Sequence, residues 1–431
     1  MNNEIYIGLL GLGTVGSGVI EVLDKNADDI EKRVGAPVKI KKILVKDLNK
    51  TREGVENFLL TDKFEDILND PEISVVVEVM GGMKPAKDYM LQALQAGKCV
   101  VTANKDVIAT SGKELFDAAR EKNADIRFEA SVGGGIPIIM PLKECLNANK
   151  ITEIMGIVNG TTNYMLTKMT EDGADYNAVL KEAQKKGYAE ANPAADVEGL
   201  DAARKAAILA SLAFNTKISL NDVSVEGITK ISPTDIAYAR ELGFVIKLLA
   251  LGKIVKGRID VRVHPTLLPQ THPMAAVNGV YNAIFIRGNA IGEAMFYGPG
   301  AGSLPTASAV VSDIINISRD ILHNTLGRIG CTCYDNKPLC PVEETKSSYY
   351  VRLLVDDEPG VLGTVATAFG ECGVNLKSVR QTTREIKNHA EIVVITHLVQ
   401  HKKILAAAKK LTEIPAINVL KNIIRVENEE N

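Results

Sequence analysis

The sequence predicts an α/β protein with three parts: a Rossmann-type nucleotide-binding domain, a second α+β domain and a C-terminal ferredoxin-like domain. Three observations carry this prediction. Apolar strand-like runs alternate with helical patterns in the first third of the chain, which favours a parallel sheet. A glycine-rich turn at 11–16 directly follows the first run. The last part, residues 349–426, has the element order β-α-β-β-α-β.

The composition is that of an ordinary globular chain and excludes several classes of protein. Of the 431 residues, 46% are hydrophobic and 24% charged. The formal charge of −3 argues against a nucleic-acid binder, which is normally basic. No run approaches the length of an apolar membrane span, so no membrane association is expected. The N-terminus lacks a basic region followed by an apolar leader, and we expect a cytoplasmic protein.

The first domain is predicted to span residues 1–130. Residues 5–10 form a short apolar run typical of a strand buried on both faces. An amphipathic helix follows the glycines, and residues 86–96 have a second helical pattern. Further strands are expected at 38–45, 74–79 and 98–102.

The middle of the chain is predicted to form a catalytic and dimerisation domain, residues 131–320. It opens with a glycine-rich loop at 131–137 and mixes long helices with strand-like stretches at 254–263 and 280–287. A helical run at 306–320 has an apolar stripe and, with 305–330, completes the first domain. We expect a homodimer or a homotetramer.

A polar linker, residues 331–347, is predicted to lead to the last domain at 348–426. Strands are expected at 349–355, 374–382, 390–396 and 416–426, with helices beginning near 361 and at 402–411. Gly373 lies where a left-handed helix C-cap is expected.

The cysteines and histidines limit the possible chemistry. Six scattered cysteines are too few for a disulfide framework. Cys331, Cys333 and Cys340 share the linker, but neither a histidine nor a fourth cysteine is near, so we do not expect a structural zinc site. The first histidine is His264, which excludes a Ser-His-Asp triad or an HExxH zinc site before it.

The motif Gly11-x-Gly13-x-x-Gly16 lies between a buried strand and a helix, the context that favours dinucleotide binding over a tight turn without a ligand. Thr14 and Val15 lie within it, at the helix start that favours a pyrophosphate. After the second strand, Asp47 suits a ribose 2′-hydroxyl, whereas Lys46, Lys50 and Arg52 suit a 2′-phosphate. We therefore favour NADP(H), with NAD(H) possible.

Two further segments contain candidate catalytic residues. Lys105 follows the strand at 98–102, at the carboxyl edge where ligands bind open sheets, although a lysine there is often only a solvated loop residue. Glu190, Asp196 and Asp201 lie on a loop and the first turn of a largely apolar helix. Asp201 and Lys205 are four residues apart on this helix, where an ion pair is costly to bury unless it has a function.

These motifs together resemble the homoserine dehydrogenases of the long bacterial type, which end in an ACT regulatory domain. The resemblance covers essentially the whole chain. Its most specific part is the segment from Gly187-Tyr-Ala-Glu190 to Leu200-Asp201-Ala-Ala-Arg-Lys205. Other matching motifs are Ala103-Asn-Lys105, Gly156-Ile-Val-Asn-Gly160-Thr161-Thr-Asn163 and Gly298-Pro-Gly-Ala-Gly302-Ser-Leu-Pro.

The resemblance implies interconversion of L-homoserine and L-aspartate 4-semialdehyde with NAD(P), in threonine, methionine and isoleucine biosynthesis. It implies that Lys205 is the proton donor and acceptor, and that Lys105 is a second catalytic lysine. The implied substrate residues are Glu190, Asp196, Asp201, Gly160 and Thr161. The implied cofactor residues, besides the glycine motif, are Lys46, Ala103, Lys105, Gly187 and Gly302. The family position that is often arginine is Lys46 here, which leaves the NADP preference open.

The resemblance also implies two further ligands. A monovalent cation, Na⁺ or K⁺, is expected at Glu129, Val132, Gly134 and Ile136. The alternative interpretation is that Glu129 is a carboxylate at the end of a strand and faces solvent. L-Threonine is expected to inhibit by binding the loop edge formed by Asp357, Gly360 and Asn375, often across a pair of ACT domains. Alternatively, the tail only dimerises.

Chemistry agrees with this resemblance. The cofactor supplies the hydride, and without histidine a lysine is the natural proton donor to the nascent alkoxide. Cys99 and Cys145 have no neighbouring histidine in sequence, which argues against a phosphorylating semialdehyde dehydrogenase. A sensor without enzymatic activity and another amino-acid dehydrogenase remain alternatives.

Overall fold

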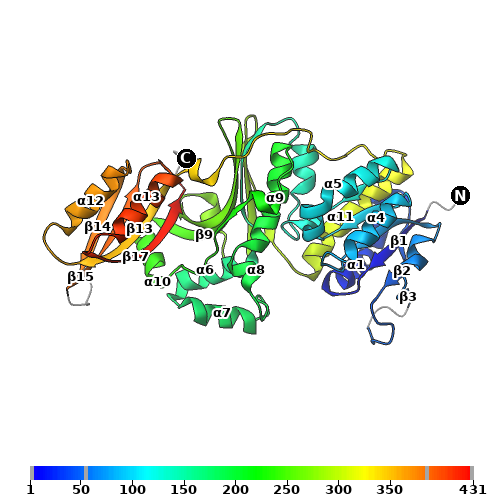
Figure 1. The fold of residues 1–431 in the computed structure, drawn as a ribbon. Helices are drawn as coiled ribbons and strands as arrows, with labels where there is room; N and C mark the ends of the chain where they lie inside the picture. The colour runs from blue at the N-terminus through cyan, green and yellow to red at the C-terminus, as the bar shows by residue number, and fades with distance from the viewer. Residues whose placement is uncertain (1–3, 53–56, 384–387, 428–431) are drawn as a thin grey trace. The chain divides into compact units, whose positions relative to one another are not determined.

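The computed structural model describes residues 4–52, 57–383 and 388–427 (Figure 1). The chain divides into two compact units. Unit 1 consists of Met1–Ile154, Arg204–Asp222 and Asn282–Asn336. Unit 2 consists of Met155–Ala203, Val223–Tyr281 and Lys337–Asn431. The domain boundaries drawn from the sequence stay predictions. Within the described ranges, the structure contains no helix long and apolar enough to cross a membrane.

Unit 1 is built on a six-stranded sheet in the order β3-β2-β1-β4-β5-β6, and all its pairs are parallel. Its strands are β1 (Ile5–Leu10), β2 (Val38–Leu44), β3 (Leu59–Thr61), β4 (Ile73–Glu78), β5 (Cys99–Thr102) and β6 (Ile126–Arg127). The four strands predicted here are confirmed. The strand order reverses between β1 and β4, which is where open α/β sheets bind their ligands.

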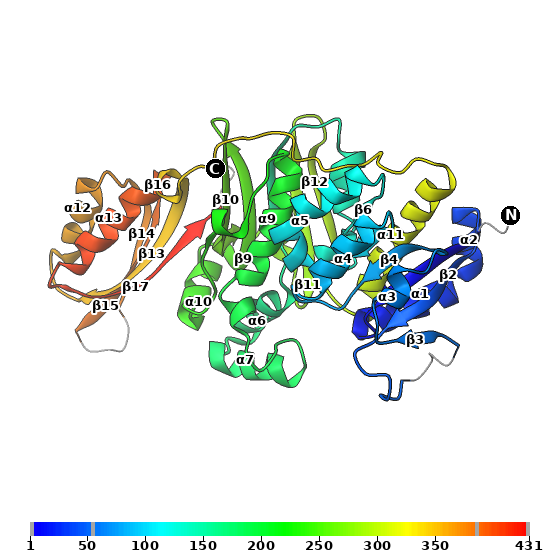
Figure 2. The same cartoon turned by 45° about the vertical axis from the view of Figure 1, so that its right-hand side comes forward.

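Helices surround this sheet (Figure 2). They are α1 (Thr14–Lys25), α2 (Ala27–Val34), α3 (Glu65–Leu68), α4 (Ala86–Gln95), α5 (Lys105–Glu121) and α11 (Ser303–Leu322). The predicted return helix is α11, and it packs closely against α1: a Cβ on Gly18 would lie 2.7 Å from the hydroxyl oxygen of Ser303.

The rest of unit 1 follows β6. A short helical turn at Glu129–Ser131 and a π-helical turn at Pro141–Cys145 lead into β7 (Ile151–Ile157). The hairpin of β11 (Tyr281–Gly288) and β12 (Gly292–Pro299) lies beside the first part of β7.

Unit 2 contains a sheet in the order β9-β10-β17-β13-β15-β14. Its helices outside the C-terminal domain are α6 (Gly160–Asp172), α7 (Tyr176–Lys185), α8 (Ala194–Val197), the start of α9 (Leu200–Phe214) and α10 (Pro233–Glu241). The short strand β8 (Ser224–Val225) pairs with β10.

One strand prediction in this region is wrong. The stretch 254–263 is not a single strand but contains the turn of a hairpin between β9 (Phe244–Val255) and β10 (Arg258–Pro269). The turn residues Lys256 and Gly257 have φ of 51° and 78°, as a two-residue hairpin turn requires. The hairpin turn was missed because a Lys-Gly pair within an apolar run is only a weak turn signal.

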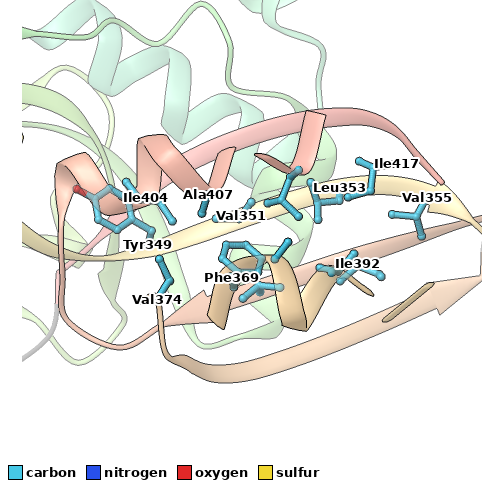
Figure 3. Close-up of a cluster of buried hydrophobic side chains, with 14 of the residues drawn as sticks. Tyr349, Val351, Leu353, Val355, Phe369, Val374, Ile392, Ile404, Ala407 and Ile417 are labelled. Atoms are coloured by element: carbon cyan, nitrogen blue, oxygen red, sulfur yellow. The ribbon is translucent and has the colours of Figure 1, made fainter. Parts of the chain in front are cut away.

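The C-terminal domain has the predicted β-α-β-β-α-β order. It contains β13 (Lys346–Asp356), α12 (Val361–Glu371), β14 (Leu376–Thr383), β15 (His389–Thr396), β16 (Val399–Gln400), α13 (His401–Thr412) and β17 (Ile417–Val426). Gly373 has the expected left-handed conformation, with φ of 67°. Both helices pack on one face of the sheet around Phe369, Leu353 and Val351 (Figure 3).

The C-terminal sheet continues into the sheet of the preceding part of unit 2. The last strand, β17, pairs antiparallel with β13 and parallel with the end of β10, where Thr266 faces Arg425. The connector also lies along β10, because Ile259 N–H donates to Pro338 O (2.9 Å) and Cys340 N–H donates to Ile259 O (2.7 Å). The domain is therefore joined to β10 by backbone pairing as well as by its connector.

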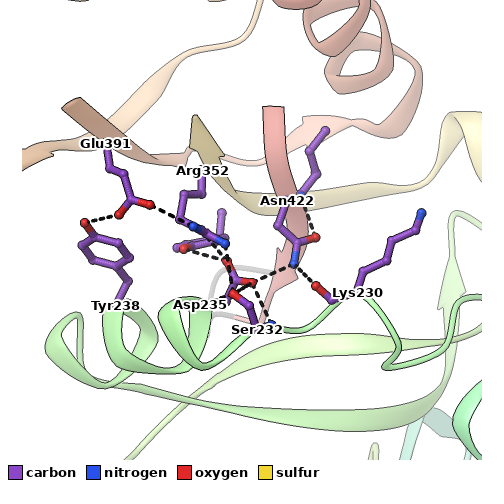
Figure 4. Close-up of polar contacts among 9 residues, drawn as sticks. Lys230, Ser232, Asp235, Tyr238, Arg352, Glu391 and Asn422 are labelled. Carbon is purple, nitrogen blue, oxygen red and sulfur yellow. Dashed lines mark hydrogen bonds and ion pairs between the residues drawn. The ribbon is translucent and has the colours of Figure 1, made fainter. Parts of the chain in front are cut away.

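A buried polar network joins α10 to the C-terminal sheet (Figure 4). The carboxylate of Asp235, fully buried, accepts from Arg352 Nε at 2.8 Å and from Asn422 Nδ2 at 3.0 Å. Arg352 also donates to Glu391 at 3.0 Å, and Tyr238 OH donates to the other oxygen of Glu391 at 2.8 Å. Asp235 thus connects the first turn of α10 with strands β13 and β17.

Candidate active site

The three motif glycines of unit 1 have different structural tasks. Gly11 has φ of 102°, a conformation that favours glycine and makes the tight turn after β1. A Cβ on Gly16 would lie 2.2 Å from Gly11 O, so only glycine lets the helix pack there. A Cβ on Gly13 would have nothing within 4 Å, which leaves its backbone open to a ligand. This is the division of roles expected of a dinucleotide-binding turn.

A cleft of about 600 Å³ extends from this turn to the ends of β2 and β4. Gly11, Gly13, Lys46, Arg52 and Asp62 are among the residues that line it. The carboxylate of Asp47 instead accepts the backbone N–H of Asn49 at 2.9 Å. The predicted cations Lys46 and Arg52 therefore face the cleft.

Thr14 and Val15 form the first turn of α1, where the positive end of the helix dipole favours an anionic group such as a pyrophosphate. Ser303 Oγ donates to Thr14 O at 2.7 Å, which holds the start of α11 against this turn. Gly302 directly precedes that contact and has φ of 130°. The predicted cofactor residue Gly302 is thereby brought to the glycine turn.

Lys105 is the first residue of α5, at the carboxyl edge of the same sheet. Ala103 N–H donates to Glu78 O at 3.3 Å, and the side chain of Asn104 caps the helix by accepting Val107 N–H. Asn104 Nδ2 also donates to Gly82 O at 2.7 Å. Lys105 therefore starts a helix that is fixed to the loop after β4.

The sequence did not reveal the role of Glu78, which organises this edge. Its carboxylate, fully buried, accepts Thr102 Oγ1 at 2.7 Å and the backbone N–H groups of Met80 and Gly81 at 2.8 and 3.1 Å. Burial raises the pKa of Glu78, whereas these hydrogen bonds lower it. A lone acid at the end of an apolar buried strand was the signal available.

Within unit 1, an ion pair joins two residues that are next to the predicted catalytic lysines in sequence. Arg204 Nε lies 2.7 Å from Asp106 Oδ1. Asp106 directly follows Lys105, and Arg204 directly precedes Lys205. The ion pair therefore links the residues that adjoin Lys105 and Lys205 in sequence, and both lysines belong to unit 1. The sequence offered both charges but no sign that they pair.

In unit 2, Asn159 gathers two of the predicted carboxylates. Its Nδ2 donates to Asp196 Oδ1 at 2.7 Å and to Asp201 Oδ2 at 2.9 Å. Its Oδ1 accepts Thr162 N–H at 2.9 Å and so caps α6. The role of Asn159, although within a recognised motif, was missed.

The other predicted substrate residues of unit 2 adjoin the same helix end. Thr161 Oγ1 donates to Tyr188 O at 2.5 Å, two residues before the exposed Glu190. A Cβ on Gly160 would lie 2.9 Å from Val280 O, so the helix start is closely packed. Gly187, with φ of 76°, lies in unit 2 while the glycine turn is in unit 1, and its cofactor role stays a prediction.

Glu129 is almost fully buried, so the alternative that it faces solvent is wrong. Its Oε1 accepts the N–H groups of Ile138 and Ile139 at 2.5 and 2.7 Å, and Oε2 accepts Met140 N–H at 2.8 Å. Burial raises the pKa of this carboxyl group, and the three amides oppose that shift. Since a carboxylate has about four acceptor positions, one remains for a cation.

The predicted effector residues do not form one edge within a single ACT domain. Asp357 N–H donates to Asn388 O, and Gly360 begins the helix that follows β13. Asn375 O accepts His397 N–H, beyond the other end of β15. The expectation of a single edge is therefore wrong for one copy, because β13 and β14 are parallel and start at the same end of the sheet. All three residues are exposed.

The fold and these residues define a class of protein. A dinucleotide cleft, two lysines at the edge of its sheet and a separate carboxylate cluster are the parts of a nicotinamide-dependent oxidoreductase that manages a proton with lysine.

The comparisons with known proteins agree with this class. Residues 11–129 match the family homoserine dehydrogenase, NAD binding domain; residues 137–315 match homoserine dehydrogenase; and residues 349–416 match the ACT domain. The homoserine dehydrogenase of Bacillus subtilis is 44% identical over 98% of both chains. That of Synechocystis is 46% identical over 98% of this chain and 99% of the relative. The chain belongs to the homoserine dehydrogenase family.

Solved structures support the same assignment. A homoserine dehydrogenase from Thiobacillus denitrificans has a TM-score of 0.94 at 40% identity, over 99% of this chain and 98% of that chain. A hyperthermophilic archaeal homoserine dehydrogenase mutant in complex with NADPH has a TM-score of 0.62 at 28% identity, over 73% of this chain and 98% of that chain. The predicted family, fold class and enzyme class are confirmed.

Proposed function

We propose that this enzyme interconverts L-homoserine and L-aspartate 4-semialdehyde with NADP(H). The observation that supports the proposal is the Arg204–Asp106 pair, which links the residues next to Lys105 and Lys205 within the unit that contains the glycine turn. The test is a nicotinamide absorbance assay with the semialdehyde in one direction and homoserine in the other. Turnover of neither compound, with another amino-acid substrate accepted, would contradict it.

The residues divide the chemical work. When bound, NADP(H) would supply or accept the hydride. Lys205 gives a proton to the aldehyde oxygen in reduction and takes it back in oxidation. Lys105, the first residue of α5, is a second catalytic lysine. Asp196 and Asp201, together with Glu190, bind the ammonium group of the substrate. Gly160 and Thr161 line the substrate pocket. Cytoplasmic threonine, methionine and isoleucine biosynthesis is part of the same proposal.

The preference for NADP(H) follows from the cations of the cleft. We expect Lys46→Ala to raise the KM for NADPH about tenfold or more, because it removes a charge-assisted contact to the 2′-phosphate. The KM for NADH should stay near that of wild type. Lys50→Ala is the matched control, since Lys50 is outside the described lining of the cleft. Equal effects of Lys46→Ala on both nucleotides would contradict the assignment.

Threonine regulation is proposed for the ACT domain. The two candidate loops lie at opposite ends of one domain, so the site should combine Asp357 and Gly360 of one copy with Asn375 of another. We expect Asp357→Asn and Asn375→Ala each to weaken threonine binding about tenfold or more. Calorimetry on the full-length protein measures this, with Glu371→Gln as a surface control on α12. If the intact enzyme neither binds threonine nor is inhibited by it, the domain is structural or binds another ligand.

A monovalent cation is proposed at Glu129 and the backbone carbonyls of Val132, Gly134 and Ile136. One carboxylate with several carbonyls is the oxygen ligand set that suits a hard cation. We expect wild-type protein to broaden the sodium NMR line and Glu129→Gln to lose this effect, because the amide removes the negative charge. Glu121→Gln, at the exposed end of α5, is the control. The proposal is contradicted if wild-type protein does not broaden the sodium NMR line and if added potassium does not change that line.

A homodimer or homotetramer completes the proposal, and it is consistent with an effector site that needs two ACT domains. Sedimentation of the full-length protein with and without threonine tests it. A monomer under both conditions would contradict the shared site as well.

A further inference from the structure

Unit 1 contains a second cavity, of about 390 Å³, that none of the proposed functional residues line. Its walls come from α5, from the last turns of α9 and from the connector after α11, and include Ile108, Phe116 and Ile208. Cys331 and Cys333 of the connector also line it. The cavity is therefore mostly apolar, with two thiols at one side.

A lysine that lies over two aromatic rings also lines this cavity. Lys143, from the π-helical turn, lies with its ammonium nitrogen 5.4 Å from the ring centre of Phe116 and 5.6 Å from that of Phe128. Among the described residues it has no hydrogen bond or ion pair. Burial lowers its pKa, because the charged form loses hydration. An anion entering the cavity would restore a partner to this ammonium group.

The two free thiols lie close together and differ in their exposure to solvent. Cys331 is exposed, whereas Cys333 is half-buried. The backbone N–H of Cys333 donates to Cys331 Sγ at 3.5 Å, and Cys333 Sγ lies 3.9 Å from Ser211 O in α9. The hydrogen bond from the Cys333 thiol lowers the pKa of Cys331, the charge of Lys143 adds to this, and Asp117 opposes it. The pKa of Cys333 is raised by the same thiol pair and by burial, with Lys143 and Lys217 opposing.

We propose that this cavity is a thiol-modification site for small disulfides that bear carboxylate groups. Lys143 attracts the carboxylate, the apolar walls hold the body of the ligand, and the thiolate of Cys331 attacks its disulfide bond. The ligand S–S bond breaks, a mixed disulfide forms on Cys331, and one ligand thiolate leaves. Cys333 then loses its proton and attacks the Cys331 sulfur, releasing the second thiolate. The protein dithiol is oxidised and the ligand disulfide is reduced to two thiols.

The proposal is independent of the proposed dehydrogenase reaction and has a direct test. Full-length protein is incubated with glutathione disulfide, and each cysteine is followed by peptide mass spectrometry. Cys145, an exposed thiol of the same chain, is the internal reference. We expect Cys331 to react at least about tenfold faster than Cys145, because the local positive charge concentrates the anionic reagent. The product in wild type is a Cys331–Cys333 disulfide, and Cys333→Ser should stop at the mixed disulfide.

Charge variants separate attraction by Lys143 from simple exposure. Lys143→Gln should reduce the rate with glutathione disulfide while leaving that with the neutral hydroxyethyl disulfide nearly unchanged, and Lys143→Arg should retain most of the difference. Circular dichroism identifies a variant that fails to fold, and the reagent comparison within wild type stands without any variant. The proposal is overturned if Cys331 reacts no faster than Cys145, or if anionic and neutral disulfides show the same preference for Cys331.

Discussion

Lys205→Ala is expected to lower kcat at least about a hundredfold while nucleotide affinity stays near that of wild type. A positioned acid or base typically contributes about 10²- to 10⁴-fold, and the side chain removed is the proposed proton donor to the aldehyde oxygen. The pairing of Arg204 with Asp106 fixes the preceding residue, so the loss should come from chemistry rather than from a displaced helix. Steady-state kinetics together with NADPH titration by fluorescence measure both quantities.

Several variants distinguish proton transfer from a structural role. Lys205→Arg should not restore activity, because guanidinium stays protonated and has a different shape. Lys105→Ala should be damaging too, with a larger share of the loss in KM. Lys25→Ala is the control. Lys25 and Glu21 form an acid–lysine pair four residues apart on the exposed face of α1, so losing this lysine should leave kcat unchanged. If Lys205→Ala retains more than about a tenth of kcat, the proton comes from Lys105 or from water.

Asp235→Ala is expected to destabilise the protein by about 3–5 kcal/mol, because it leaves Arg352 buried without its main partner. Burial alone would raise the pKa of Asp235, but the Arg352 guanidinium holds it below the usual value. The carboxylate therefore stabilises the fold above the pKa of an unfolded aspartate, and this contribution is lost as the pH falls through the lowered pKa. Denaturant unfolding at neutral pH and at acid pH measures the difference.

Glu241→Ala is the matched control for Asp235→Ala, since both acids lie on α10. Glu241 pairs with Arg380 at 2.6 Å, but both side chains are about half exposed, so its loss should cost at most about 1 kcal/mol. The difference between the variants should also shrink at acid pH. Similar costs at neutral pH would mean that the Arg352 network is no more important for stability than a surface pair.

The elements with strong local signals could be predicted from the sequence. The strand–glycine turn–helix at the N-terminus and the six main elements of the C-terminal domain have apolar periods and turn residues within a few positions of each other. Lys105 was placed correctly at the sheet edge because the end of a strand is visible in the sequence. Asp196 and Asp201 were grouped because they lie on one short segment.

The contacts that organise the site depend on residues far apart in the chain, which no local pattern reports. Arg204 and Asp106 are on different helices. Asn159 donates to the carboxylates of Asp196 and Asp201, which lie 37 and 42 residues further along the chain. The effector loops were misjudged for a related reason. Both loops contain a glycine, but only the strand pairing shows that a helix carries the chain from one end of the sheet to the other between them.

The pairing of β17 with β10 has a consequence for synthesis of the protein. Part of one edge of β10, at Thr266 and Leu267, receives its partner only when the ribosome reaches residues 417–426. Until then, the nascent chain presents an open strand edge of the kind that invites pairing with other chains. Pairing along this part of β10 therefore waits for the last segment to be translated. A fusion partner or truncation at the C-terminus should impair the yield of folded enzyme more than a comparable change at the N-terminus.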